Sequence, residues 1–98
     1  MSRLIKNSNI ALFEYPHGAE NPKFSLDEKN ILWIEGYSVQ LMGSPIRSMK
    51  RYDFSSELDG YKVLGRYEDV KSKIKIDLTD VLNEYDVDAE NCLVLIKK

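Results

Sequence analysis

The sequence predicts a small β-rich α+β domain: an antiparallel β-sandwich or barrel with one short C-terminal helix. Most apolar segments are short and rich in the β-branched and aromatic residues that strands favour. Only one segment, near the C-terminus, spaces its apolar residues as on a helical face. The apolar run Cys92–Ile96 then closes the chain, and we expect it to be an interior strand.

Length and composition predict one soluble domain over residues 1–98. A chain of 98 residues with 43% hydrophobic residues can form one core but not two. The net charge of −2 favours neither nucleic acid nor a membrane surface. The lone Cys92 excludes an internal disulfide, and no signal-peptide pattern or bilayer-length apolar run occurs. We therefore expect a cytoplasmic protein with no membrane association. A secreted domain taken from a longer chain is the alternative, because it would show the same composition.

The N-terminal third reads as two strands separated by a loop. Ile10–Tyr15 is a short apolar run that ends at a proline, which predicts a first strand. Residues His17–Lys23 carry the glycine and proline typical of a loop. Phe24 and Leu26 alternate with polar neighbours as in a short edge strand, and Asp27–Asn30 predicts a turn.

The longest predicted strand covers Ile31–Met42 and ends at Gly43-Ser44-Pro45. Its apolar alternation changes phase at Gly36. A β-bulge at this glycine would bring both halves of the strand onto one buried face. The residues expected on that face are Leu32, Ile34, Tyr37, Val39 and Leu41.

A β-hairpin is predicted over Tyr52–Tyr67. Asp59-Gly60 is a pair typical of a two-residue type I′ turn. With the turn there, one face of the hairpin is mostly aromatic and aliphatic. The other face pairs opposite charges, for example Glu57 with Lys62.

The C-terminal segments predict a strand, a helix and a strand. Lys71–Leu78 alternates lysine with serine and isoleucine, which predicts a strand with one lysine face. Apolar residues from Leu78 to Tyr85 follow at helical spacing, with Asp77 as a cap. Asp86–Asn91 is a polar return loop before the final strand.

Two stretches of this region, Ile76–Leu82 and Asn91–Ile96, resemble a strand–short helix–strand unit of galactose-binding-like jelly-roll domains. They are also similar to the last strands of the C-terminal β-domain of plant polyphenol oxidases. The resemblance covers about a quarter of the chain and implies a β-sandwich scaffold. It carries no functional residue to this sequence.

Residue types predict no enzyme, no metal site and no cofactor. His17 is the only histidine, and Cys92 lies in a predicted interior strand where a reactive thiolate is disfavoured. One histidine and one cysteine cannot form a tetrahedral zinc site. Asp86–Glu90 alternates carboxylates like a calcium loop, but the required glycine and downstream glutamate are missing. No glycine-rich phosphate loop occurs.

Carboxylates gather on and after the predicted helix, and this charge asymmetry motivates the main functional hypothesis. Such a patch steers a partner protein that carries a basic surface. A small bacterial or phage inhibitor, antitoxin or immunity protein would need this arrangement. The alternative is a solvated face that keeps the protein soluble. The residues expected to bind the partner are Asp80, Glu84, Asp86, Asp88 and Glu90.

Other binding functions are open from the sequence. Basic residues interleaved with aromatic residues could bind single-stranded nucleic acid. The basic candidates are Arg47, Lys50 and Arg51. A β-sandwich could instead bind carbohydrate through exposed aromatic residues. A structural subunit could form homo-oligomers through an open strand edge. The aromatic candidates for carbohydrate are Tyr15, Trp33 and Tyr37.

Overall fold

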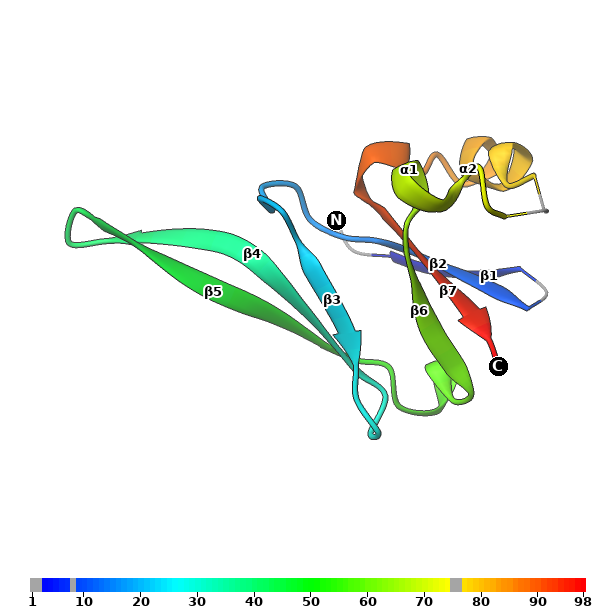
Figure 1. The fold of residues 1–98 in the computed structure, drawn as a ribbon, viewed down its shortest axis with the longest axis horizontal. Coiled ribbons are helices and arrows are strands. Elements are labelled where there is room, and N and C mark those ends of the chain that lie inside the picture. The colour runs from blue at the N-terminus through cyan, green and yellow to red at the C-terminus, as the bar shows by residue number, and fades with distance from the viewer. Residues whose placement is uncertain (1–2, 8, 75–76) are drawn as a thin grey trace. The chain divides into compact units, whose positions relative to one another are not determined.

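The computed structural model describes residues 3–7, 9–74 and 77–98. Its strands form two antiparallel sheets, accompanied by short helices (Figure 1). This confirms the predicted β-rich α+β class. The chain divides into two compact units, and the predicted single domain over 1–98 stays a prediction. One unit comprises Met1–Pro16 and Tyr61–Lys98, and the other comprises His17–Gly60.

The first unit contains a four-stranded sheet in the order β1-β2-β7-β6. These strands are β1 (Arg3–Asn7), β2 (Ile10–Glu14), β6 (Tyr61–Arg66) and β7 (Cys92–Lys97). Residues 92–95 of β7 are all buried, which confirms the predicted interior strand. Strand β1 was not predicted, because only its central residue is buried and its apolar pattern is correspondingly weak.

Three short helices accompany this sheet (Figure 1): α1 (Tyr67–Val70), α2 (Thr79–Glu84) and the 3₁₀ turn η2 (Ala89–Asn91). The predicted helix is confirmed as α2, but its N-cap is Leu78 and not Asp77. Asp77 precedes the N-cap, and its Oδ1 accepts the Thr79 N–H at 2.9 Å. Helices this short depend on packing for their stability. No helix within the described ranges is long and apolar enough to cross a membrane. The core they share with the sheet contains Ile5, Ile10, Leu12, Val70, Leu78, Val81, Leu82, Val87, Cys92 and Val94.

The second unit contains the three-stranded sheet β3-β4-β5. Its strands are β3 (Lys23–Leu26), β4 (Ile31–Leu41) and β5 (Ser44–Asp53). Strand β3 lies at an edge, as predicted, and pairs only with residues 32–35 of β4. The distal half of the β4–β5 hairpin is therefore a two-stranded ribbon.

The predicted bulge in β4 is confirmed. The β4–β5 register shifts between Glu35 and Tyr37, and Gly36 has a φ of +118°. The shift places the residues before and after it on one face, so Leu32, Ile34 and Tyr37 are all buried. Val39 and Leu41 were expected on the same face, and their side chains lie outside the described part of the structure.

The predicted hairpin over 52–67 is wrong. Strand β5 pairs with β4 along its length, while β6 pairs with β7. Between them, Asp53 Oδ1 accepts the Ser55 N–H at 3.1 Å, and the chain turns into the 3₁₀ helix η1 (Ser55–Leu58). Asp59 has a φ of −63°, whereas a type I′ turn requires positive φ at both central residues. Glu57 and Lys62 are therefore not cross-strand partners.

Positive φ at two successive residues occurs instead at Met42 and Gly43, which have φ of +50° and +82°. These two residues connect β4 to β5 between the paired Leu41 and Ser44. The sequence Met-Gly lacks the asparagine or aspartate that usually marks this turn. The turn is therefore imposed by the pairing of the two long strands.

The predicted lysine-faced strand is also wrong over residues 71–74. Lys71 and Lys73 lie in turns that follow α1. The Val70 carbonyl accepts the N–H groups of Lys73 at 2.8 Å and Ile74 at 3.1 Å, and these local bonds favour a helical turn over an extended strand. Lys75 and Ile76, the next residues of that prediction, lie outside the described residues.

Candidate functional site

The five carboxylates proposed from the sequence lie on α2, on the loop after it and on η2. Asp80 and Glu84 are four residues apart and therefore share one face of α2. Both are exposed, as are Asp86 and Glu90, while Asp88 is partly buried. We call this set the acidic segment: Asp80, Glu84, Asp86, Asp88 and Glu90.

Buried side chains fix the backbone beneath the acidic segment. Val81 and Leu82 face the core from α2, and Val87 is buried just after the helix. The Val87 N–H donates to the Leu82 carbonyl at 2.9 Å. The carboxylates therefore project from a backbone that is packed and hydrogen-bonded.

Two residues of the N-terminal strands also hold the loop that follows α2. Arg3 Nη2 donates to the Asp86 carbonyl at 2.9 Å, and Glu14 Oε2 accepts the Asp88 N–H at 2.8 Å. Arg3 and Glu14 oppose each other in the β1–β2 register and form an ion pair of 3.1 Å. Sequence reasoning missed both residues, and no local pattern links them to a loop so far along the chain.

The environment of Glu14 shifts its acidity. Burial raises the pKa of this carboxyl group, but the hydrogen bonds from the Asp88 N–H and Arg3, with the charge of Arg3, outweigh it. The net result is a pKa below the usual value for glutamate. Glu14 therefore remains ionised and hydrogen-bonded at neutral pH.

Within the acidic segment, Asp88 has a structural task that the other four do not share. Its Oδ1 accepts the Glu90 N–H at 3.0 Å and so caps η2. In the described part of the chain, the side chains of the remaining four carboxylates form no ion pair. Tyr85 lies among them in sequence with 45% of its surface exposed. The segment thus combines solvated negative charge with one exposed aromatic ring.

The three basic residues proposed for nucleic acid do not share one face of the sheet. Arg47 and Arg51 have the same parity on β5, and Lys50 has the other. The Lys50 ammonium lies 4.9 Å from the centre of the Tyr37 ring, and the Arg51 guanidinium lies 5.8 Å from the Trp33 ring. Both cations are therefore in range of cation–π attraction with a ring on their own side.

The aromatic candidates for carbohydrate differ in exposure. Tyr15 and Tyr37 are buried, while Trp33 is partly exposed. Trp33 Nε1 donates to Asp27 Oδ2 at 3.2 Å. Hydrogen bonds from the Ile31 N–H, this indole and the Lys29 N–H lower the pKa of Asp27. The Trp33 ring is therefore held in place by Asp27 and covered in part by Arg51.

Of the residues considered for catalysis, Cys92 lies in unreactive surroundings. Cys92 is fully buried, and burial, with the charges of Glu14 and Asp88, raises the pKa of its thiol to about 12. The thiol is therefore protonated at neutral pH. His17 is exposed in the loop before β3. Among the residues that the structure describes, no group of three histidine, cysteine or carboxylate side chains could hold a metal ion.

No protein-family model, curated protein or solved structure matches this chain. Its function is therefore inferred from its own residues.

Proposed function

We propose that this protein is a non-catalytic protein-binding module that neutralises a partner protein with a basic surface. Small inhibitors, antitoxins and immunity proteins belong to this class. The observation that supports the proposal is the acidic segment. Its four exposed carboxylates lack ion pairs among the described residues and stand on a packed backbone. We place this function in the cytoplasm, where the single Cys92 would stay reduced.

The electrostatic argument concerns both rate and specificity. Clustered charge of one sign raises the association rate with an oppositely charged partner and disfavours acidic competitors. Since these four carboxylates form no ion pair among the described residues, a basic surface that docks on them breaks none of the ion pairs seen there. Tyr85 would supply a less polar anchor at the centre of such an interface, a common role of exposed tyrosine.

The anchored backbone supports the same proposal. An interface on a mobile loop loses conformational entropy when it binds, whereas a preorganised one loses less. Hydrogen bonds from Arg3 and to Glu14 hold the loop at Asp86 and Asp88 before any partner arrives. The acidic segment is thus suited to rapid and specific docking.

The experiment is affinity purification of the tagged full chain from its native cells, with and without nuclease. We expect one stoichiometric protein that survives nuclease treatment. Its capture should weaken as salt increases, because the interaction is electrostatic. Loss of all captured material on nuclease treatment would contradict the proposal and favour nucleic acid. Capture of further copies of this chain alone would contradict it in favour of the strand-edge oligomer.

A charge-reversed variant tests the location of the site. It leaves Asp88 unchanged, because that residue caps η2, and it uses asparagine at position 86, where φ is +52°. The variant should fold and lose the captured partner. Undiminished capture would contradict this site. The substitutions are Asp80→Lys, Glu84→Lys, Asp86→Asn and Glu90→Lys.

A matched control changes the net charge equally in the other unit. It also uses three lysine substitutions and one asparagine substitution, all at exposed positions. Capture should persist, and equal loss in both variants would mean that net charge alone is responsible. The control substitutions are Glu20→Lys, Glu28→Lys, Glu57→Lys and Asp59→Asn.

A further inference from the structure

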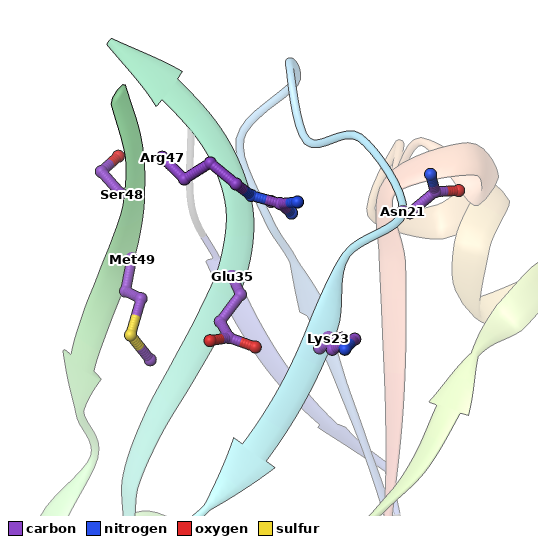
Figure 2. A pocket seen from close by; sticks show the side chains of 7 residues that line it. Asn21, Lys23, Glu35, Arg47, Ser48 and Met49 are labelled. Atoms are coloured by element: carbon purple, nitrogen blue, oxygen red, sulfur yellow. The ribbon is translucent and has the colours of Figure 1, made fainter. Parts of the chain in front are cut away.

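The second unit carries a pocket of about 460 Å³ beside the β4 bulge (Figure 2). This volume falls in the range typical of small-molecule sites, about 300–1,000 Å³. The loop before β3 and all three strands of the sheet contribute to it. The residues that line it are Asn21, Lys23, Glu35, Gly36, Arg47, Ser48 and Met49.

The bulge and the loop fix the shape of this pocket. The Glu20 N–H donates to the Gly36 carbonyl at 2.9 Å, which fastens the loop against β4. A Cβ at position 36 would lie 2.7 Å from the Glu20 carbonyl oxygen, so the close approach requires glycine. Asn21 has a φ of +46°, a sparsely populated conformation. Bulges often redirect side chains next to binding sites.

The charged side chains of the pocket are arranged around Glu35. Lys23 lies directly opposite Glu35 on β3, and Met49 lies opposite on β5. Arg47 is two residues from Met49 on the same face, and Figure 2 shows its side chain reaching across β4 toward the loop that carries Asn21. Within the described residues, none of these three charged groups forms an ion pair.

The charge pattern selects among small ligands. A simple anion would gain from Lys23 and Arg47 but would be repelled by Glu35. A simple cation would be attracted by Glu35 but repelled by Lys23 and Arg47. A ligand with a carboxylate next to an ammonium group satisfies all three charges, through charge-assisted hydrogen bonds.

We infer that this pocket binds a small zwitterion with the chemistry of an α-amino acid. Lys23 and Arg47 hold the carboxylate, and Glu35 accepts hydrogen bonds from the ammonium group. Met49 is 50% exposed, and its thioether faces an apolar substituent of the ligand.

The test is a titration of the ¹⁵N-labelled full chain, followed by amide chemical shifts. The probes are L-methionine, sodium propionate and inorganic phosphate. L-methionine should shift the amides of Lys23, Gly36 and Ser48 in a saturable way, and the other two probes should not at the same concentration. Absence of saturable shifts with L-methionine would overturn the inference. Equal binding of phosphate or propionate would overturn the zwitterion class.

Variants locate the site and assign its charges. Arg47→Gln should weaken L-methionine binding about tenfold, the loss expected for one charge-assisted bond. Arg51→Gln removes the same charge from the same strand and face outside the pocket lining, and should leave binding unchanged. Equal effects of the two variants would overturn the assignment.

Glu35→Gln gives a signature that a merely structural role would not produce. Loss of the carboxylate charge should weaken L-methionine binding and strengthen propionate binding, because repulsion of the anion disappears. Unchanged preference between the two probes would overturn the role of Glu35. The amide spectrum of each variant reports in the same experiment whether the chain remains folded.

Discussion

The Glu14 carboxylate accepts the backbone N–H of Asp88 at 2.8 Å, across 74 residues of sequence. The same carboxylate pairs with Arg3, whose guanidinium also donates to the carbonyl of Asp86. One partly buried acid therefore connects the first two strands to the loop of the acidic segment. Its protonation should loosen that loop.

The pKa of Glu14 predicts an acid-dependent loss of stability. Its pKa in the folded protein is below the ordinary value, so its stabilisation is fully present above the unfolded pKa of about 4.3. That stabilisation should disappear as the pH falls through the folded value. Urea unfolding of wild type and Glu14→Gln at pH 7 and pH 3 measures it.

At pH 7 the Glu14→Gln variant should lose about 1–2 kcal/mol of unfolding free energy, since it weakens hydrogen bonds to a charged group. At pH 3 the difference from wild type should shrink. Glu90→Gln is the control, because Glu90 is exposed and forms no ion pair among the described residues. A difference that is the same at both pH values would contradict the assigned role of the Glu14 charge.

Substitution of Gly36 by alanine should destabilise the second unit strongly. The backbone there has a φ of +118°, and the new Cβ would lie 2.7 Å from the Glu20 carbonyl oxygen. Backbone strain and the clash together should cost about 2 kcal/mol or more of unfolding free energy. Thermal or urea unfolding measures the loss.

Gly18→Ala is the matched control for the bulge. Gly18 also has a positive φ, of +104°, but nothing lies within 4 Å of the position that a Cβ would occupy there. This variant should lose only the cost of backbone strain, about 1 kcal/mol. Equal losses at both glycines would mean that the contact between Gly36 and Glu20 is not as close as the structure has it.

A double-mutant cycle on Glu57 and Lys62 distinguishes the observed pairing from the local hairpin. Direct cross-strand partners of opposite charge should couple by about 0.2–1 kcal/mol. In the structure Lys62 pairs with Ile96, while Glu57 lies in η1, so the coupling energy should be near zero. The cycle uses Glu57→Lys, Lys62→Glu and the double variant in urea unfolding. A coupling energy of about 0.2–1 kcal/mol would instead support the local hairpin.

The segments that were predicted correctly are those whose structure depends on residues close together in the sequence. The change of phase at Gly36 is visible within one strand, and so is the helical spacing that places Val81 and Leu82 in the core. The acidic segment is also visible in the sequence as a run of carboxylates, but its role as a binding site stays a prediction. Strand pairing, in contrast, depends on segments that are distant in sequence. The hairpin predicted from Glu57 and Lys62 satisfied the local rule that opposite charges face each other, but that rule takes no account of distant strands. Strand β7, whose residues 92–95 are buried and apolar, pairs with β6, and no local charge pattern indicates this partner.

The two residues that hold the loop of the acidic segment were not predicted, for a related reason. Arg3 and Glu14 act on backbone groups that lie 83 and 74 residues away in sequence. Backbone donors and acceptors are the same at every position, so no residue type marks Asp86 or Asp88 as their target. The pocket at Gly36 was missed because its charges come from three strands and unite only when the sheet forms.

The Met42-Gly43 turn offers a stabilising substitution. Met42 has a φ of +50° and its side chain is 98% exposed, so it bears backbone strain without burying apolar surface. Asparagine tolerates this conformation, and Asn-Gly is a preferred type I′ pair. Met42→Asn should therefore raise the unfolding free energy of the second unit by about 1 kcal/mol. The fluorescence of Trp33, the only tryptophan in the chain, measures the unfolding of this unit directly.

Met49→Asn is the matched control for this turn. Met49 is also exposed, but it lies within β5 and has no positive φ. Asparagine is disfavoured in strands, so this variant should be neutral or destabilising. A stabilisation confined to Met42→Asn supports a turn of positive φ at the end of the ribbon. If neither variant is stabilised, the strands do not impose a left-handed backbone on Met42.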